Sequence, residues 1–525
     1  MWQKISKLFA EKKSLRGASI LLVVTVTLSN ILGLFRDRFL AKNISTYDLD
    51  IYYSAFRIPD LIFNLMILGA IYTAFVPIFT DFIAQKKEKD GLRVANSLLN
   101  LSLIFTIISA VLLYFLMPYA MKLVVPNFGP DRFDQAVRYA RLMMLTPLFF
   151  SFSYILSGIL NSFHRFFAYS VAPLVYNLAI MFGAYFLAPH YGVIGVIYSV
   201  IAGAFLHFLV QVFPAVKLGW RYQAIIQIKD QAVQKIIKLV IPRTISLGGD
   251  QIGLIIFTAI GSSLAAGSIS AYTLASNIQT MPVFVLGSAF AAAVFPTLAL
   301  KISHNDKDSF VYYFDRALRA SLFLLVPVSG IFIVLRAQIV RLILGSGKFD
   351  WNDTKTTSMV LGVFAVSIVA QGLIPLVSRA FYAMKNTRIP MYISISTVAI
   401  SAAIAYPLAS RFGAPGLAMA YSAASFFQLI MLLSFLGREM PKIVNAELIW
   451  SFVRIILISV ATTVIMWLSL HPLAGLVDMN TFLGVLEQTI GTILIGAIAF
   501  FAITTLCKCP ELKWALTRNV DGEGR

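Results

Sequence analysis

Charged side chains stand inside strongly apolar stretches of this sequence, where they could bind a charged ligand. Arg36, Asp37 and Arg38 close the first long apolar stretch, and Arg57 and Asp60 lie in the opening turns of the second. A charge inside a membrane-spanning segment is costly, and it usually faces a partner or a water-filled cavity. Guanidinium groups keep their charge and match phosphate oxygens in a forked geometry. Arg36 and Arg57 are therefore candidate ligands for a phosphate-bearing substrate.

The same residues also allow a simpler interpretation. Pairing between arginine and aspartate at the end of the first stretch could anchor it at the membrane surface. Arg57 and Asp60 are three residues apart, so they share one face of a helix and could neutralise each other. Asp50 and Asp60 could instead bind Na⁺ or H⁺. From the residues alone, these alternatives stay open.

A second group of charges lies near the middle of the chain. Arg243 follows Pro242 about ten residues into an apolar stretch, which is about 15 Å along a helix axis and too deep for easy contact with the membrane surface. Asp250 follows seven residues later, and a buried pair with Arg243 is the alternative to a place in a cavity. Proline and the Gly248-Gly249 pair favour a bend in this helix. Asp250 is also a candidate for ion or proton coupling.

The elements that must position these charges are membrane helices. Hydrophobic residues make up 59% of the 525 residues and charged residues 13%, whereas soluble domains have about 45–50% and about 25%. Apolar stretches long enough to cross a hydrocarbon core of about 30 Å recur along the chain, and their continuity favours helices over barrel strands. We predict an all-α polytopic membrane protein with about 14 transmembrane helices. The predicted spans are 15–36, 53–83, 96–121, 137–161, 168–188, 192–216, 233–260, 267–299, 314–335, 357–382, 389–409, 413–436, 447–470 and 484–507.

The distribution of basic residues predicts an orientation. The formal charge is +19, and most lysines and arginines fall in the segments that are cytoplasmic if the N-terminus is inside. The positive-inside rule therefore places both termini in the cytoplasm. The basic excess is thereby explained as a topology signal, and we expect no nucleic-acid partner.

An internal repeat divides the chain. Tyr191-Gly192-x-x-Gly195 opens the sixth span and Phe412-Gly413-x-x-Gly416 opens the twelfth, an offset of 221 residues. Before each glycine motif, a proline-bearing helix leads through a short basic turn into the next span. In the first copy the helix contains Pro147 and the turn contains Asn161 and Arg165. In the second copy these are Pro375, Asn386 and Arg388, at an offset near 225. Six spans separate the copies, which predicts two six-helix lobes related by a parallel pseudo-two-fold axis.

The repeat predicts four regions. These are an N-terminal lobe with an interfacial segment (1–216), a cytoplasmic linker (217–232), a C-terminal lobe (233–437) and a two-helix hairpin with a cytoplasmic tail (438–525). Since the two lobes already supply the pseudo-symmetry, we expect a monomer.

Enzymatic motifs are missing from the sequence. It contains no P-loop, nucleophile elbow or His-Glu-x-x-His motif, and Cys507 and Cys509 have no histidine or further cysteine nearby to complete a metal site. We therefore expect a transporter without metal or cofactor, driven by Na⁺ or H⁺ coupling or by the membrane potential.

Several motifs in register point to a known family. They are Ser29-Asn-Ile-Leu-Gly33-Leu-Phe-Arg36-Asp37, Ala55-Phe56-Arg57-Ile58-Pro59-Asp60, Gly69-Ala70-x-x-x-Ala74-Phe75-Val76-Pro77, Gly158-Ile-Leu-Asn161 with Arg165-Phe166, Pro282 with Leu286-Gly287, and Gly347-Lys348-Phe349. With these motifs the sequence resembles the MurJ (MviN) lipid II flippases. That family belongs to the multidrug/oligosaccharidyl-lipid/polysaccharide exporter superfamily.

The resemblance implies a function and a site. It implies alternating access that carries lipid II, an undecaprenyl-pyrophosphate glycan used in peptidoglycan synthesis, from the inner to the outer leaflet of the bacterial inner membrane. The head group would occupy a cationic central cavity, and the lipid tail a groove on the last two helices. By position, Arg36 and Asp50 match residues needed for function in the family, and Arg57 matches a site that is usually Lys or Arg.

The sequence departs from the family at several cationic positions. Family arginines fall here on Asn30, on Phe63 and Asn64, and on Asn277. Arg243, where the family usually has a small residue, could restore a charge from the adjacent helix. The neutral positions keep a second hypothesis open, in which the chain exports another polyprenyl-linked polysaccharide unit or drugs. A membrane enzyme such as a glycan polymerase is a third hypothesis, which the short outer loops disfavour.

Overall fold

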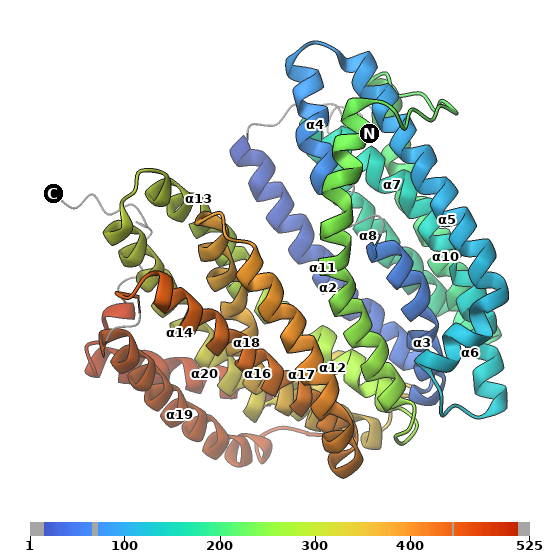
Figure 1. Ribbon diagram of the computed structural model, residues 1–525. Helices are drawn as coiled ribbons and strands as arrows, with labels where there is room; N and C mark the ends of the chain where they lie inside the picture. Colours follow the sequence, from blue (N-terminus) through green and yellow to red (C-terminus); the bar gives the residue numbers. More distant parts are fainter. Residues whose placement is uncertain (1–14, 66–71, 444–445, 513–525) are drawn as a thin grey trace, which may run out of the picture. The chain divides into compact units, whose positions relative to one another are not determined.

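The structure, a computed structural model, describes most of the chain. It covers residues 15–65, 72–443 and 446–512, but within these ranges it leaves out the side chains of 15–23, 72–73, 241–247 and 250. The described residues contain helices and no strands. The prediction of an all-α chain is confirmed. Figure 1 labels the helices.

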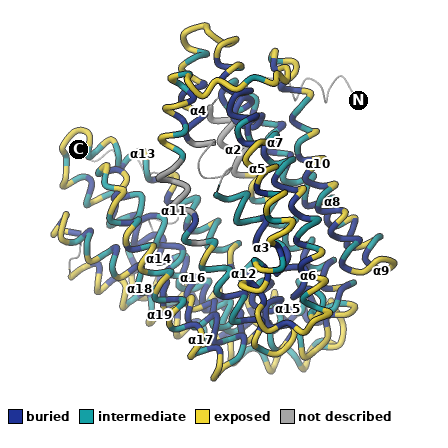
Figure 2. The backbone as a smooth tube through the Cα atoms, turned by 45° about the vertical axis from the view of Figure 1, so that its right-hand side comes forward, coloured by how far each residue is buried: buried dark blue, intermediate teal, exposed yellow. Residues whose placement is uncertain are grey.

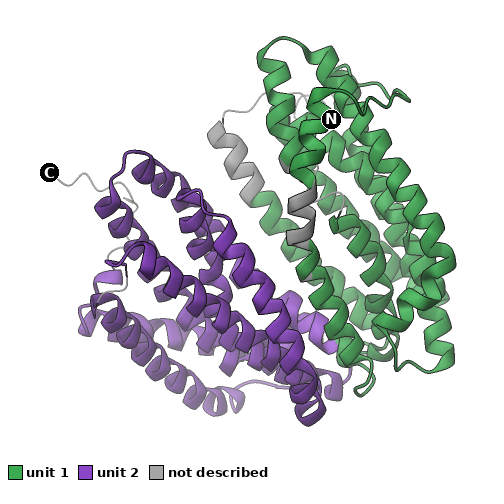
Figure 3. Ribbon diagram, in the orientation of Figure 1, with its two compact units in different colours: residues 1–270, 346–349 green, residues 271–345, 350–525 purple. Residues whose placement is uncertain are grey.

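The chain forms two compact units (Figure 3). Unit 1 comprises residues 1–270 and 346–349, and unit 2 comprises residues 271–345 and 350–525. The helices of unit 1 are α2 (Leu15–Asn43), α3 (Thr46–Phe63), α4 (Tyr72–Ala84), α5 (Glu88–Val124), α6 (Pro130–Met143), α7 (Leu145–Ser162), α8 (Phe166–Phe182), the π-helix η2 (Gly183–Leu187), α9 (Ala188–Tyr191), α10 (Val193–Lys217) and α11 (Gln231–Gly261).

Unit 2 begins within α12 (Ser268–Pro282), whose first turn belongs to unit 1. Its other elements are the π-helix η3 (Val283–Ser288), α13 (Ala289–Ser303), α14 (Lys307–Val334), α15 (Arg336–Leu344), α16 (Trp351–Ala383), α17 (Arg388–Phe412), α18 (Ala414–Glu439), α19 (Ala446–Ala474) and α20 (Phe482–Leu506). Helix α16 packs against α13, α14, α15 and α18 and forms the centre of this unit.

Eleven helical segments among the described residues are long and apolar enough to cross a membrane. Each of the fourteen predicted spans overlaps one helix or one series of helices. The three predicted spans beyond the eleven, 15–36, 53–83 and 233–260, all include residues that the structure does not describe in full. The multi-pass membrane fold is confirmed, and the count of fourteen stays a prediction.

Many large apolar residues of these helices are exposed; Figure 2 marks the exposed parts of the chain in yellow. On α5, Ile108 and Phe115 are 60% and 69% exposed, and on α19 Leu457 and Leu468 are 62% and 59% exposed. Apolar surface of this extent is unfavourable in water but not against acyl chains. These faces therefore indicate where lipid surrounds the helices.

The first repeat motif has the same backbone in both copies. Gly192 has φ 62° and ψ −144°, and Gly413 has φ 65° and ψ −144°. Only glycine adopts such angles without strain. The N–H of Gly192 donates to Ala188 O at 2.9 Å, and the N–H of Gly413 donates to Ala409 O at 2.8 Å. A Cβ at the third residue after each turn glycine would collide with a carbonyl oxygen of the preceding helix.

The second repeat motif is a left-handed turn, and its predicted offset near 225 is wrong. His164 and Lys385 have φ 58° and 60°. The next residue donates its N–H to the carbonyl five residues earlier, from Arg165 to Leu160 O at 2.8 Å and from Asn386 to Phe381 O at 2.9 Å. The two turns are 221 residues apart. The offset near 225 came from the asparagines and prolines, but it is the backbone turn that recurs in the structure. Both motifs thus share one offset.

The predicted lobes are a different division from the compact units. Helix α11 belongs to compact unit 1, whereas the repeat assigns it to the second lobe. The lobes, with the boundaries given above, stay a prediction. The segment between α10 and α11 is held against α5, where Asn100 Nδ2 donates to the carbonyls of Gln223 and Ile225 at 2.8 Å.

Candidate functional site

Arg36 connects two helices of unit 1. Its Nε and Nη2 donate to Asp37 Oδ1 at 3.0 and 2.8 Å, and its Nη1 donates to Asn177 Oδ1 of α8 at 3.3 Å. Asn177 in turn donates to Ser29 Oγ of α2 at 3.3 Å. The Arg36 side chain is 23% exposed, whereas that of Asp37 is 1% exposed. The guanidinium group is therefore fixed in direction but still open to a ligand.

Arg57 and Asp60 lie in the same electrostatic neighbourhood. Arg57 Nε donates to Thr258 Oγ1 of α11 at 2.8 Å. Asp60 interacts electrostatically with both Arg57 and Arg36. Two cations and two carboxylates from α2 and α3 are thus brought together inside unit 1. Asn177 ties α2 to α8, and Thr258 of α11 accepts from Arg57 of α3. We call Arg36, Asp37, Arg57 and Asp60 the charged cluster.

Asp50 is buried and fully engaged by the protein. Its Oδ1 accepts from Ser270 N at 2.8 Å and from Ser270 Oγ at 2.7 Å. Its Oδ2 accepts from Gly267 N at 2.7 Å and from Arg132 Nη2 of α6 at 3.3 Å. The carboxylate therefore caps the first turn of α12 and joins it to α3 and α6. This is a positioning role, and a contact between Asp50 and substrate stays a prediction.

The other predicted site residues are placed as follows. Arg243 and Asp250 belong to α11, but their side chains lie outside the described residues. Their pairing and the bend near them stay predictions. Asn277 lies on α12 in unit 2, and Asn30 lies on α2 in unit 1.

Asn30 lines an uncharged cavity of about 300 Å³ within unit 1. Helices α2, α7, α8 and α10 form its walls, and none of the described lining residues is charged. The lining residues are Thr25, Val26, Ser29, Asn30, Tyr154, Ser157, Tyr169, Ser170, Pro173 and His207. Hydroxyl and amide groups beside aromatic rings suit an uncharged, hydrogen-bonding ligand.

Behind this cavity, a buried polar network fixes α7 to α10. Ser153 Oγ lies 2.6 Å from His207 Nδ1 and accepts from Gln211 Nε2 at 2.5 Å. Ser157 Oγ donates to Gln211 Oε1 at 2.6 Å, and the ring of Tyr154 stacks on His207 with centroids 6.0 Å apart. A satisfied network of this kind specifies one arrangement of the helices.

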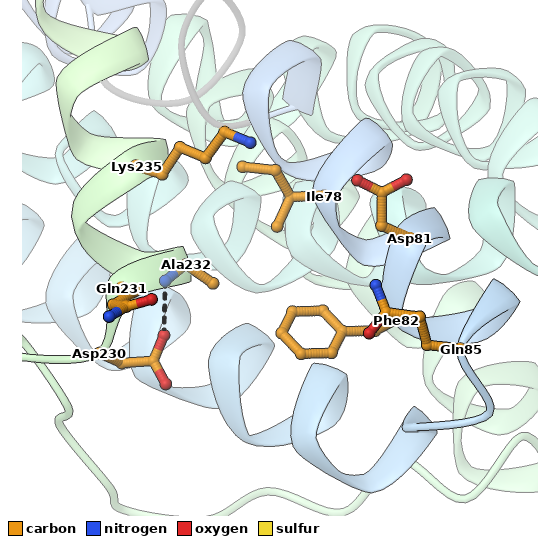
Figure 4. A pocket seen from close by; sticks show the side chains of 8 residues that line it. All are labelled: Ile78, Asp81, Phe82, Gln85, Asp230, Gln231, Ala232 and Lys235. Atoms are coloured by element: carbon orange, nitrogen blue, oxygen red, sulfur yellow. Dashed lines mark hydrogen bonds between the residues drawn. The ribbon is translucent and has the colours of Figure 1, made fainter.

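A second cavity, of about 450 Å³, lies between the end of α4 and the start of α11 (Figure 4). Asp81, Asp230 and Lys235 contribute its charges. Asp230 is already the N-cap of α11, where its Oδ1 accepts from Ala232 N at 2.8 Å. Two carboxylates against one ammonium group give this cavity no preference for an anion. It is a weaker candidate for a phosphate-bearing substrate than the charged cluster.

Sequence reasoning missed the residues that hold the site. Asn177, Thr258 and Arg132 each contact a predicted residue from a distant helix. One signal was available: Asn177 is a lone amide in the apolar stretch 174–188, and such a group in a membrane helix needs a partner. Thr258 and Arg132 carry no comparable signal, since threonine is common in membrane helices and Arg132 lies outside the predicted spans.

Comparisons with known proteins agree with this fold. The family model described as lipid II flippase MurJ matches residues 45–485. The probable lipid II flippase MurJ of Rhizobium tropici is 28% identical over 494 residues, which cover 90% of this chain and 91% of that protein. The corresponding protein of Rickettsia prowazekii (strain Madrid E) is 26% identical over 501 residues, which cover 94% and 97%.

Solved structures give the same result. A lipid II flippase MurJ in an inward closed conformation matches with a TM-score of 0.78 at 25% identity, covering 93% of this chain and 98% of that one. An inward-facing multidrug resistance MATE family transporter of the MOP superfamily matches with a TM-score of 0.66 at 14% identity, covering 81% and 98%, and shares the fold alone. Because the family model spans most of the sequence, this chain belongs to the lipid II flippase MurJ family.

Proposed function

We propose that this protein is a lipid II flippase of the bacterial inner membrane. It carries the lipid-linked peptidoglycan precursor from the inner to the outer leaflet by alternating access. The observation that carries the proposal is the charged cluster of α2 and α3, in a chain that belongs to the MurJ family. A pyrophosphate cannot cross hydrocarbon unless cations replace its hydration, and the cluster supplies two guanidinium groups.

The geometry suggests a division of roles. Arg36 and Arg57 bind the pyrophosphate, and the exposed part of Arg36 is the point of contact. Asp37 neutralises Arg36 in the absence of substrate and competes with phosphate for the same N–H groups. Such competition keeps the affinity moderate, which release on the other side of the membrane requires. Asn30 offers its amide to uncharged groups of the sugars.

Coupling and topology are part of the same proposal. Asp60 and Asp250 are the candidates for Na⁺ or H⁺ coupling, and the membrane potential could reset a positively charged cavity without an ion. Both termini lie in the cytoplasm, as the basic residues predict. The protein acts as a monomer and as a transporter, with no catalytic step.

A second candidate function rests on the neutral positions. Asn30 and Asn277 stand where the family has arginine, and fewer cations would suit a polyprenyl-linked unit with less negative charge, or a drug. Asn30 lines a cavity whose described lining residues are all uncharged. This alternative predicts export without any effect on lipid II.

The deciding experiment measures where lipid II accumulates. Cells depleted of the protein should retain lipid II in the inner leaflet, out of reach of a reagent added outside, and wild-type protein should restore access. Arg36→Ala should fail to restore it and Arg36→Lys should restore it partly. Arg411→Ala, at an exposed helix end, is the matched control and should restore it fully. If lipid II stays accessible after depletion, the proposal is wrong and the second candidate gains support.

A further inference from the structure

A third cavity, of about 540 Å³, lies wholly in unit 2 and shares no residue with the charged cluster. It is enclosed by α15, by the first turns of α16 and by the last turns of α19. Among its lining residues are Arg336, Gln338, Trp351, Lys355, Trp467 and Leu470. The cavity thus combines basic, amide and indole groups at one end of the unit.

Its charge is positive. Arg336 and Lys355 are the charged side chains among the described residues that line it. Two carboxylates of the neighbouring turn are already engaged with each other's backbone, since Asp353 N donates to Asp350 Oδ1 at 2.8 Å and Asp350 N donates to Asp353 Oδ2 at 3.2 Å. The lining therefore complements an anion.

The arginine is held in place by the helix below it. A Cβ added at Gly362 of α16 would lie 2.7 Å from Arg336 Cδ, so the stem of Arg336 packs closely on α16 at this glycine. Arg336 Nη1 donates to Ile333 O at 2.7 Å. A guanidinium group has five N–H donors, so the anchored group keeps donors for a ligand.

Two of the lining helices, α15 and α19, are also fixed by contacts with α20. Gln338 of α15 donates to Gln488 Oε1 of α20 at 3.3 Å, and Gln488 Nε2 donates to Leu470 O of α19 at 3.0 Å. Gln488 is 3% exposed. The buried amide of Gln488 therefore joins α15 and α19, two of the helices that line the cavity, through α20.

The surroundings are those of a membrane interface. Trp351 and Trp467 are 66% and 57% exposed, and exposed tryptophan favours the head-group level of a bilayer. From Trp467 an exposed apolar face runs along α19 through Val464, Val460 and Leu457. This spacing of three and four residues marks one face of the helix. Acyl chains that cover this face would place their head groups at the cavity.

We propose that this cavity binds the phosphate of an anionic glycerophospholipid, with its acyl chains along α19. Arg336 and Lys355 contact the phosphate, Gln338 contacts the polar head group, and the two tryptophans lie beside the glycerol and the upper chain segments. Because residues of α15, α16 and α19 line the cavity, a bound lipid stabilises the packing of these helices. The proposal does not depend on the transported substrate.

The test uses the tryptophans as reporters. The full chain is reconstituted in phosphatidylcholine bilayers that contain increasing fractions of phosphatidylglycerol with brominated acyl chains, which quench nearby tryptophan fluorescence. We expect a saturable quenching component at low phosphatidylglycerol fractions, and none with brominated phosphatidylcholine at the same fractions. The component should vanish in Trp351→Phe/Trp467→Phe, whereas Trp450 near the start of α19 should still report bulk lipid.

The basic residues provide the decisive variants. Arg336→Gln and Lys355→Gln should each weaken the preference for phosphatidylglycerol about fivefold, and the double variant should abolish it. Arg336→Lys should retain it, and Arg411→Gln is the matched control that should leave it unchanged. Thermal unfolding in phosphatidylcholine confirms that each variant is folded. Equal quenching by both lipids in the wild type, or a preference that survives in the double variant, would overturn the proposal.

Discussion

Two copies of one helix pair have the same backbone and different interiors. The turns at Gly192 and Gly413 agree within a few degrees, and both lead into a long helix. In the first copy, Ser153 and Gln211 belong to the buried network around His207. The residues 221 positions later are Ile374 and Leu432. The comparison indicates that the turn glycines maintain the repeated scaffold, whereas these two network positions are polar in the first copy and apolar in the second.

The two units also differ in the partners of their arginine side chains. In unit 2, Arg319 pairs with Asp315 at 2.9 Å, and Arg454 pairs with the buried Glu511 at 2.8 Å. Each pair is neutral overall; the first lies within α14, and the second joins α19 to the segment after α20. In unit 1, Arg57 hydrogen-bonds a neutral threonine and Arg36 retains an exposed portion. The two arginines of the charged cluster thus differ from Arg319 and Arg454 in their contacts, because Arg36 keeps an exposed portion and Arg57 contacts a hydroxyl group. The following predictions test this difference.

The largest effect is expected for transport. Arg36→Ala should lower the rate of lipid II flipping per folded molecule by about 10²-fold or more, since removing one partner of a buried charge pair costs about 2–5 kcal/mol. Arg319→Ala in unit 2 should reduce the amount of folded protein but leave the rate per folded molecule nearly unchanged. Flipping in reconstituted vesicles, normalised to folded protein, measures both. Equal losses of rate in the two variants would contradict the assignment of function to unit 1.

The next effect concerns stability. Asp50→Ala removes the carboxylate partner of Arg132 and the acceptor of two backbone donors, Gly267 N and Ser270 N, so it should lower the free energy of unfolding by about 3–5 kcal/mol. Asp350→Ala removes an exposed N-cap of α16 in unit 2 and should cost about 1 kcal/mol. Thermal unfolding in detergent compares the stability of the two alanine variants. The loss of stability in Asp50→Asn should lie between their losses. A similar shift for both alanine variants would show that the Asp50 network contributes no more than an ordinary cap.

Much of this architecture could be predicted from the sequence because it depends on local patterns. Hydropathy locates the helices, and the glycine motif locates the repeated turn. Arg36 and Arg57 stand out because a charge in an apolar stretch is rare. Their partners could not be predicted. Arg36 meets Asn177 and Asp50 meets Ser270 across 141 and 220 residues, so these pairings depend on how the helices pack.

A smaller effect on stability is expected for the turn glycines, which belong to the scaffold that both copies share. Gly192→Ala and Gly413→Ala should each lower the free energy of unfolding by about 1–3 kcal/mol, because both glycines have backbone angles that alanine adopts only with strain. The two shifts in melting temperature should agree closely, and the flipping rate per folded molecule should change little in either variant. If only one of the two variants lost stability, the surroundings of the other turn would have to relieve the strain of alanine. The two copies would then not be equivalent.

The last prediction involves no change in stability and tests the orientation of the copies. His164 and Lys385 occupy equivalent exposed turns, so a parallel repeat places both on one side of the membrane. Burial raises the pKa of the Cys509 thiol, which leaves the exposed Cys507 as the more reactive native cysteine. Replacing both with serine removes this background before His164→Cys or Lys385→Cys is introduced.

A membrane-impermeant maleimide then reports the side of each turn in intact and permeabilised cells. If both termini are cytoplasmic and the repeat is parallel, neither cysteine reacts until the cells are permeabilised, and then both react. Labelling of one turn alone in intact cells would indicate an inverted repeat, which places equivalent turns on opposite sides. Labelling of both in intact cells would preserve the parallel repeat but reverse the orientation. The alternation of basic residues along the chain would then need a cause other than topology, because a reversed chain places most lysines and arginines outside.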